Sequence, residues 1–320
     1  MSNNVQNKRP LVVLTGPTAV GKTALSIHLA KAIGGEIISA DSMQVYKQMD
    51  IGTAKIKPEE MQGVRHYLVD ECMPDEEFHV VKFKEYANRY IEEIYQKGKI
   101  PILVGGTGFY IQAVLKDVSF EQEEVSEYRR TLEQLAEEKG AHYLHEQLQK
   151  VDPESAAAIH ENNVRRVIRA LEYYEQTGEK ISKHNEREKQ KESPYNFAYF
   201  VLNQPREVLY NRIDKRVDIM IEEGLVEEVT GLIEKGYGRD LVSMQGLGYK
   251  EIYSYLQNEM TLSEAIYILK RDTRHFAKRQ LTWFKREQDV VWVDKEKLLT
   301  EEQQLSFCLK ILREKGIWKD

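Results

Sequence analysis

The sequence predicts an α/β protein, with a parallel sheet core, a helical insertion and a helical C-terminal part. Three observations predict this architecture. A glycine-rich loop follows a short apolar run at residues 11–15, similar apolar runs alternate with amphipathic segments up to residue 104, and the middle of the chain has helical composition without a plausible strand. Strands that alternate with helices, each ending in a loop, are typical of a parallel sheet.

Short runs rich in Val, Ile and Leu mark the expected strands of the first part. They lie at residues 11–15, 36–39, 65–69 and 100–104. Helices are expected at residues 23–32, where Gly34 and Gly35 end the pattern, and at residues 83–96, where the apolar spacing is helical. The sheet core therefore begins at the N-terminus of the chain.

The composition changes near Phe120. Residues 121–174 are rich in Glu, Gln, Leu, Ala and Arg at helical spacing, and Asp152-Pro153 is a helix start signal. The polar residues 177–193 predict a loop or hinge, and strands return at residues 196–202 and 290–294. We therefore expect residues 1–120 and 190–320 to form the core, and residues 121–189 to form a helical insertion.

The composition is that of an ordinary globular chain. The 320 residues are 41% hydrophobic and 31% charged, with a formal net charge of −6, and no apolar run is long enough to span a bilayer. Residues 1–10 lack the apolar region of a secretory signal. The two cysteines, Cys72 and Cys308, are too few for a disulfide framework. We expect a cytoplasmic protein without a membrane partner.

The glycine-rich loop matches the pattern G-x-x-x-x-G-K-[ST] at every fixed position. It reads Gly16-Pro17-Thr18-Ala19-Val20-Gly21-Lys22-Thr23. In this motif successive backbone N–H groups point at phosphate oxygens, the lysine adds a full positive charge, and the last hydroxyl can hold Mg²⁺. The loop predicts a P-loop NTPase-like core that grips a diphosphate, with Thr23 as metal ligand. Most such loops hold a nucleoside triphosphate, so the motif alone favours a kinase or another NTPase.

Asp41 closes the second expected strand and should lie near the glycine loop, at the carboxyl edge of the sheet. Three roles are open on sequence grounds. The carboxylate can be a magnesium ligand, a general base that accepts a proton from an incoming nucleophile, or the cap of a turn.

Four blocks of sequence, in order, carry a family resemblance. They are Asp41-Ser42-Met43-Gln44-Val45-Tyr46 with Met49-Asp50-Ile51-Gly52-Thr53-Ala54-Lys55, the glycine loop from Pro101 to Tyr110, Gly246-Leu247-Gly248-Tyr249-Lys250-Glu251, and the basic segment from Thr273 to Phe284. Together with the phosphate loop they resemble the bacterial tRNA dimethylallyltransferases, over residues 11 to 286. These enzymes transfer a prenyl group to N6 of adenosine 37, beside the anticodon of tRNA.

The resemblance implies a catalytic set of Asp41, Thr18, Lys22 and Arg216. The phosphate loop would hold the diphosphate of dimethylallyl diphosphate with Mg²⁺, and Asp41 would act as the base. Thr18 matches a position that contacts the substrate, and Arg216 matches an arginine that reaches the diphosphate. An ordinary ion-pair position on an exposed helix is the alternative for Arg216.

The resemblance also implies a surface for the anticodon stem-loop of tRNA. The implied contact positions are Asp41, Ser42, Met43, Gln44, Thr107, Arg129, Arg165, Arg166, Val167, Ile168, Arg169, Gly248, Tyr249, Arg274, Lys278 and Arg279. Thr107 has the alternative role of a turn hydroxyl. Independently of the family, helical geometry places Arg271, Arg274, Lys278 and Lys285 on one face, and a one-signed basic face is typical of phosphate-backbone contact.

The expected activity is therefore transfer of a dimethylallyl group to tRNA by a monomer. An isopentenyltransferase that acts on free adenine nucleotides would have no need for the helical insertion and the basic segment. A P-loop small-molecule kinase would leave the basic segment without a role. A non-catalytic RNA-binding protein would have no use for Lys22, Thr23 and Asp41 together.

Overall fold

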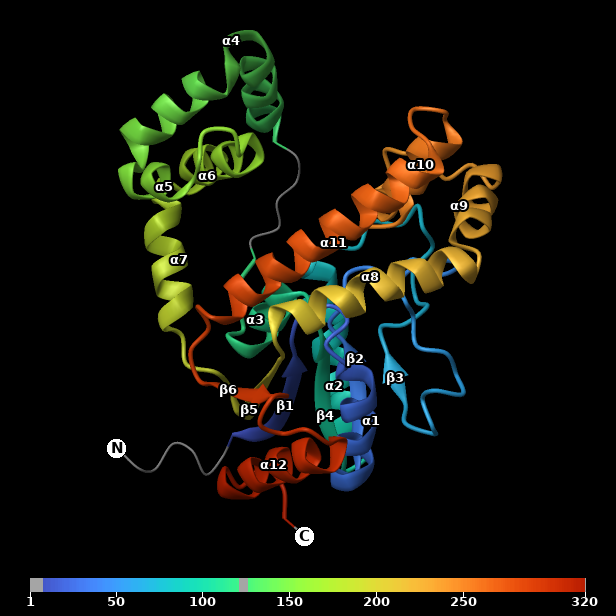
Figure 1. Ribbon diagram of the computed structural model, residues 1–320. Coiled ribbons are helices and arrows are strands. Elements are labelled where there is room, and N and C mark those ends of the chain that lie inside the picture. The colour runs from blue at the N-terminus through green and yellow to red at the C-terminus, as the bar shows by residue number, and fades with distance from the viewer. Residues whose placement is uncertain (1–7, 121–125, 320) are drawn as a thin grey trace. The chain divides into compact units, whose positions relative to one another are not determined.

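The structure, a computed structural model, describes residues 8–120 and 126–319. The chain divides into two compact units (Figure 1). One is formed by residues Met1–Leu115 and Pro194–Asp320, and the other by Lys116–Ser193. The boundaries expected from the sequence lie a few residues from these.

The first unit is built on a six-stranded sheet with the order β3-β2-β4-β1-β5-β6. Its strands are β1 (Arg9–Thr15), β2 (Gly35–Ser39), β3 (His66–Tyr67), β4 (Ile100–Gly105), β5 (Tyr195–Asn203) and β6 (Val290–Asp294). All five neighbouring pairs are parallel, so the predicted parallel α/β core is confirmed. The strand expected over residues 65–69 is shorter, because the backbone turns to positive φ at Leu68.

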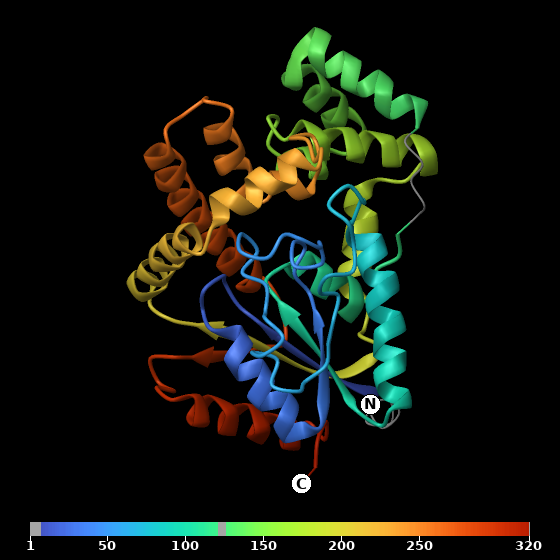
Figure 2. The same cartoon turned by 90° about the vertical axis from the view of Figure 1, so that its right-hand side faces the viewer.

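Helices cover both faces of the sheet. Val12 and Leu14 belong to a core with α1 (Lys22–Ile33) and α12 (Glu301–Glu314), whereas Leu11 and Val13 belong to a core with α2 (Val80–Gln96) and α3 (Gly108–Leu115). In Figure 2, the blue α1 and the teal α2 lie on opposite sides of the sheet. This two-sided burial explains why the strands are apolar runs and not alternating ones.

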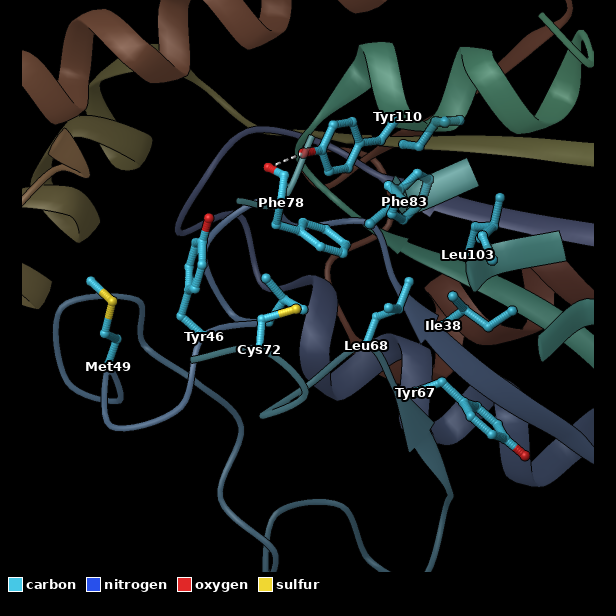
Figure 3. Close-up of a cluster of buried hydrophobic side chains, with 14 of the residues drawn as sticks. Ile38, Tyr46, Met49, Tyr67, Leu68, Cys72, Phe78, Phe83, Leu103 and Tyr110 are labelled. Carbon is cyan, nitrogen blue, oxygen red and sulfur yellow. Dashed lines mark hydrogen bonds between the residues drawn. The ribbon is translucent and has the colours of Figure 1, made fainter. Parts of the chain in front are cut away.

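The second core extends under the loop that follows β2 (Figure 3). Tyr46 and Cys72 are buried there beside Phe78, and the Phe83 and Tyr110 rings stack with centroids 4.4 Å apart. Burial raises the pKa of the Cys72 thiol, which leaves it a packing residue. The loop that carries Asp41 is therefore packed onto α2 and α3.

Four further helices complete this unit. They are α8 (Arg206–Glu222), α9 (Leu225–Glu234), α10 (Tyr249–Leu256) and α11 (Leu262–Phe284), with a short 3₁₀ turn, η1 (Ser243–Gln245). The helices α8 and α11 are in contact and lie side by side in Figure 1. A reciprocal cap fixes the start of α11, since Thr261 accepts from the Glu264 N–H while the Glu264 carboxylate accepts from the Thr261 N–H.

The second unit is helical, with α4 (Glu127–Val151), α5 (Pro153–Ala158), α6 (Val164–Thr177) and α7 (Ile181–Gln190). The loop expected over residues 177–193 is wrong, because most of that segment forms α7. No described residue of α7 is buried, so the apolar spacing that would have indicated a helix is missing. Its first turn is held by Asp152, which accepts from the Ser182 N–H and hydroxyl, and its far end has a Lys191–Glu188 ion pair.

Candidate active site

Three of the predicted site segments of the first unit follow the carboxyl ends of neighbouring strands. The phosphate loop follows β1, Asp41 follows β2, and Gly106 and Thr107 follow β4. Because these strands are parallel and adjacent, their ends meet at one edge of the sheet.

The backbone of the phosphate loop has positive φ angles at its two glycines. Gly16 and Gly21 have φ of 146° and 93°, and α1 begins directly afterwards at Lys22. The Lys22 Nζ donates to the carbonyl oxygens of Gly16 and Pro17, at 3.0 Å each. Burial lowers the pKa of Lys22 to about 8, an effect that the nearby Asp41 carboxylate opposes.

A cavity of about 230 Å³ opens beside the loop. It is lined by Thr18, Ala19, Gly21, Lys22, Thr23, Asp41, Gln44, Thr53, Ala54, Arg212 and Arg216. All four predicted catalytic residues therefore surround one space, although α8 supplies Arg216 from a distant part of the chain.

Of the three roles that the sequence left open, Asp41 takes that of the turn cap in the structure. Its Oδ1 accepts from the Met43 N–H at 2.9 Å and the Gln44 N–H at 3.4 Å, so it caps the turn after β2. The same carboxylate lines the cavity and attracts both Lys22 and Arg216. The turn holds the carboxylate in place beside the phosphate loop.

Arg216 does not form the ordinary helix-surface pair that was the alternative. It is half-buried, and Asp214 pairs instead with Arg274 on α11, at 2.5 Å. Burial lowers the pKa of Arg216, the Asp41 carboxylate opposes this, and the like charge of Arg212 lowers it further. The guanidinium is therefore held near the carboxylate and the loop.

Gln280, a buried residue of α11, joins the two glycine loops. Its Oε1 accepts from the Thr18 N–H at 2.9 Å, and its Nε2 donates to the Gly106 carbonyl at 3.0 Å. A Cβ on residue 106 would lie 2.2 Å from that Nε2, so glycine is needed there. The sequence motifs did not predict a role for Gln280, and a polar side chain on the inner face of a basic helix was the available signal.

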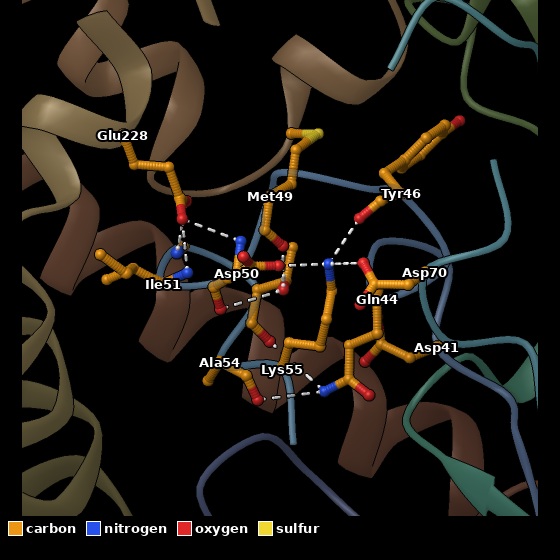
Figure 4. A network of polar contacts seen from close by, with 12 residues as sticks. Asp41, Gln44, Tyr46, Met49, Asp50, Ile51, Ala54, Lys55, Asp70 and Glu228 are labelled. Atoms are coloured by element: carbon orange, nitrogen blue, oxygen red, sulfur yellow. Dashed lines mark hydrogen bonds and ion pairs between the residues drawn. The ribbon is translucent and has the colours of Figure 1, made fainter. Parts of the chain in front are cut away.

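The loop from Asp41 to Lys55 is held by two further residues that the sequence analysis did not single out (Figure 4). The Nζ of Lys55, whose side chain is 4% exposed, donates to the Tyr46 carbonyl at 2.6 Å and pairs with Asp50 and Asp70 at 2.5 Å each. The Glu228 carboxylate of α9 accepts from three successive N–H groups, those of Asp50, Ile51 and Gly52. Lys55 and Glu228 thereby fix the loop that forms one wall of the cavity.

Comparison with known proteins agrees with this architecture. The family model described as IPP transferase matches residues 44–287, most of the chain. A tRNA dimethylallyltransferase of Lachnoclostridium phytofermentans is 65% identical over 312 residues, which cover 97% of this chain and 100% of that relative. The chain belongs to the IPP transferase family. The tRNA dimethylallyltransferase of Acetivibrio thermocellus is 53% identical and covers 92% of this chain and 94% of its own length.

Solved structures of the IPP transferase family have the same fold. The tRNA isopentenylpyrophosphate transferase of Bacillus halodurans is 47% identical, with a TM-score of 0.72, over 97% of this chain and 98% of that one. A eukaryotic dimethylallyltransferase described as acting on tRNA is 30% identical, with a TM-score of 0.83, over 97% of this chain and 79% of that one. Among the described residues of the present chain, no helix is long and apolar enough to cross a membrane.

The block around Gly248 and Tyr249 resembles a tRNA-contacting segment of the family, but here both residues are buried. The Tyr249 hydroxyl donates to Glu228 at 2.7 Å, and a Cβ on Gly52 would lie 2.6 Å from the Tyr249 ring. The Tyr249 ring packs under the loop that Glu228 holds, and contact of Gly248 and Tyr249 with tRNA stays a prediction.

The remaining predicted contact positions of the first unit differ in exposure. Ser42, Met43, Gln44 and Thr107 are half-buried. The Gln44 Nε2 donates to the Ala54 carbonyl at 3.2 Å, and the Thr107 carbonyl accepts from the Tyr110 N–H at the start of α3. Lys278 and Arg279 of α11 and Lys285, the residue that follows this helix, are exposed. The basic face is smaller than predicted, because Arg274 pairs with Asp214 and Arg271 pairs with Asp272.

In the helical unit only part of the predicted contact segment is accessible. Arg165, Arg166 and Arg169 are exposed, whereas Val167 and Ile168 are in the core of the unit, 0% and 5% exposed. Contact of the segment 165–169 with tRNA stays a prediction, with the three arginines as its accessible side chains. Arg129 is bound to the buried Glu172 carboxylate, through its Nε at 2.8 Å and an Nη at 2.6 Å, and Ser126 donates to the same carboxylate. Arg129 therefore fixes the start of α4 to α6.

The predicted Mg²⁺ position fits the residues present. Thr23 is exposed at the start of α1 and lines both the 230 Å³ cavity and a neighbouring cavity of about 660 Å³. Within residues 8–120 and 126–319, no group of three or more His, Cys, Asp or Glu side chains could hold a metal ion. A single hydroxyl with one nearby carboxylate is nevertheless a suitable donor set, since Mg²⁺ beside a diphosphate takes most of its ligands from phosphate and water.

Proposed function

We propose that this protein transfers the dimethylallyl group of dimethylallyl diphosphate to N6 of adenosine 37 in tRNA and releases diphosphate. The observation that carries the proposal is the cavity in which the phosphate loop, Lys22 and Arg216 meet the Asp41 carboxylate. A cationic site for a leaving diphosphate lies directly beside a proton acceptor, as alkylation of an amine requires.

In the proposed reaction, negative charge develops on the diphosphate at the phosphate loop, and a proton is released beside Asp41. The C–O bond between the dimethylallyl C1 and the diphosphate breaks, and its electron pair leaves with the diphosphate. Backbone N–H groups of the loop, Lys22 and Arg216 stabilise that negative charge. The N6 lone pair of adenosine forms the new bond to C1, and the N6 proton passes to the Asp41 carboxylate. Thr18 borders the same space, where it can position the donor.

Mg²⁺ is part of the proposal, with the Thr23 hydroxyl as its protein ligand. When bound, the ion adds positive charge to the leaving diphosphate. Lys22 and Arg216 supply charge to the same group independently of the ion.

The acceptor is proposed to be the anticodon stem-loop of tRNA, bound by a monomer in the cytoplasm. Three exposed arginines of α6 (Arg165, Arg166 and Arg169) and the exposed Lys278 and Arg279 of α11 supply cations for phosphate contacts. The relatives named above are described as tRNA enzymes, which favours tRNA over a free adenine nucleotide as acceptor.

One assay tests the proposal against its rivals. The protein is incubated with unmodified tRNA, Mg²⁺ and dimethylallyl diphosphate labelled in the prenyl group, and parallel reactions contain free AMP in place of tRNA. Label is expected on tRNA and, after digestion, on the adenosine beside the anticodon. Label on AMP alone would instead indicate a free-nucleotide enzyme. Transfer of phosphate from ATP to a small molecule, without prenylation, would indicate a kinase.

A further inference from the structure

Two cationic side chains that nothing above assigns to the reaction border the phosphate loop. These are Arg212 of α8 and Lys295, the residue that follows β6. The loop already has Lys22 and Arg216 beside it, so four cations converge on one end of the cavity region.

Arg212 lies four residues before Arg216 on α8 and therefore faces the same side of the helix. It lines the 230 Å³ cavity together with Arg216. Its Nη2 would lie 3.5 Å from a Cβ placed on Gly21, which puts the guanidinium against the turn of the loop into α1. The head group thus borders the first turn of α1, where backbone N–H groups favour an anion.

Lys295 reaches the same turn from the sheet. Its backbone N–H donates to the Asn203 carbonyl, which anchors it at the carboxyl edge, and its half-buried Nζ donates to the Val20 carbonyl at 3.1 Å. That Nζ would lie 3.1 Å from a Cβ on Gly21. Burial lowers the pKa of Lys295, and the positive charge of Arg212 lowers it further.

The four cations have no matching carboxylates. Across the described part of the chain, no ion pair within 4.0 Å joins a carboxylate to Lys22, Arg212, Arg216 or Lys295. Two acidic residues of α8 could have paired with these cations, but both form ion pairs with α11 instead. Asp214 pairs with Arg274, and Asp218 pairs with Lys270. Asp41 acts on Lys22 and Arg216, Glu60 on Arg216 and Glu301 on Lys295, all from beyond ion-pair distance. None of these carboxylates neutralises a cation by direct contact, an arrangement that favours a polyvalent anion.

We propose that Arg212 and Lys295 bind the diphosphate at the Gly21 end of the phosphate loop, as a second pair of cations beside Lys22 and Arg216. The identity of the diphosphate as part of a prenyl donor rests on the proposed function. The free protein keeps like charges close together, and the bound anion relieves their repulsion. Arg212 and Lys295 should therefore add to ligand affinity without adding to the stability of the free protein.

The experiment measures binding of inorganic pyrophosphate by calorimetry, together with the unfolding temperature of the free protein. The variants are Arg212→Met, Lys295→Met and the double variant. Arg206→Met on α8 and Lys297→Met after β6 are matched controls, since these exposed cations lie on the same elements away from the cavity. Each test variant is expected to bind pyrophosphate about tenfold more weakly, as for loss of one charge-assisted hydrogen bond, and the double variant weaker again. The controls should bind like the parent.

The unfolding temperature separates a ligand-binding role from a structural one. The free Arg212→Met protein is expected to unfold at the parent temperature or above it, because repulsion is removed. In Lys295→Met the lost bond to the Val20 carbonyl offsets that gain, so its unfolding temperature should stay near that of the parent. Affinity within twofold of the parent in both variants would overturn the proposal. A lowered unfolding temperature with unchanged affinity would also overturn it, and would make the two residues structural.

The inference and the proposed function can fail separately. Weaker pyrophosphate binding by the variants, combined with a parent protein that prenylates no tRNA, would keep the cation pair and reject the proposed donor. Normal prenylation of tRNA with unchanged pyrophosphate binding would keep the function and reject the cation pair.

Discussion

The Gln280 side chain accepts a hydrogen bond from the Thr18 backbone N–H at 2.9 Å, across 262 residues of sequence. Through its other amide atom the same side chain donates to the Gly106 carbonyl. The basic helix α11, the phosphate loop and the second glycine loop are thereby joined through one side chain. The Gln280 amide thus fixes the distance between α11 and the backbone of both loops.

This relationship predicts that Gln280→Met lowers kcat/KM for prenyl transfer by about tenfold or more. Methionine has a similar length but removes the bond to the half-buried Thr18 N–H and leaves the buried Gly106 carbonyl without that partner, the latter at about 1–3 kcal/mol. Steady-state kinetics with tRNA and dimethylallyl diphosphate provide the measurement. Gln304→Met is the matched control, since Gln304 is also buried, 2% exposed, but belongs to α12. The control should lose stability and keep kcat/KM, and an equal kinetic loss in both variants would remove Gln280 from the site.

Parts of the site were predictable because each of them depends on one short, continuous segment of the sequence. The phosphate loop is a continuous motif whose glycines and lysine fix its own backbone. Asp41 follows an apolar strand, so its place at the sheet edge follows from the parallel topology. Gln280 and Glu228 were missed because their partners are distant in sequence, and a spacing rule cannot pair residues across such separations.

The sequence predicted a loop where α7 lies, and this error also has a physical cause. The helix α7 has no apolar face, so its side-chain pairs and the Asp152 contacts, not periodicity, hold it in place. Tyr249 and Val167 lie in segments that resemble RNA contacts, yet burial directs their side chains into the cores of their units. A motif match locates a segment, and packing decides which of its side chains reach the surface.

Asp41→Asn and Asp41→Ala are expected to separate the base from the turn cap. Asparagine keeps an oxygen for the Met43 and Gln44 N–H groups but is a poor proton acceptor, so kcat should fall by about 10²–10⁴ while the dissociation constant for tRNA stays near that of the parent. Alanine removes the cap as well, and should also weaken tRNA binding. Single-turnover rates and filter binding measure the two effects. An asparagine variant with more than a tenth of the parent rate would show that Asp41 is not the base.

The exposed and the paired cations of α11 should differ in the salt dependence of tRNA binding. Replacing both Lys278 and Arg279 by methionine should reduce the slope of log K against log[salt] by about 0.7–0.9 for each phosphate that is no longer neutralised. Arg274→Met should leave the slope nearly unchanged, because Arg274 is occupied by Asp214. The slope is measured by filter binding at several salt concentrations. A larger change for Arg274→Met than for the double variant would reverse the assignment.

Lys22 makes pyrophosphate binding sensitive to pH. Its pKa in the free protein is lowered to about 8 by burial, so the ammonium loses its proton as the pH rises through that value, well below the range of an exposed lysine. The advantage of the parent over a Lys22→Met variant in binding pyrophosphate should therefore shrink between about pH 7 and pH 9. Comparison with the variant at each pH removes the titration of pyrophosphate itself.

A Lys22→Arg variant supplies the control, because a guanidinium keeps its charge throughout this range. Its advantage over Lys22→Met should stay constant with pH, whatever its absolute size. Calorimetric titrations at pH 7, 8 and 9 without Mg²⁺ measure all three proteins. If the parent and Lys22→Arg showed the same dependence on pH, a group other than the Lys22 ammonium would control binding. Because the pKa is lower in the folded chain than in the unfolded one, the unfolding free energy of the free protein should also rise with pH above about 8, and Lys22→Met should lose that rise.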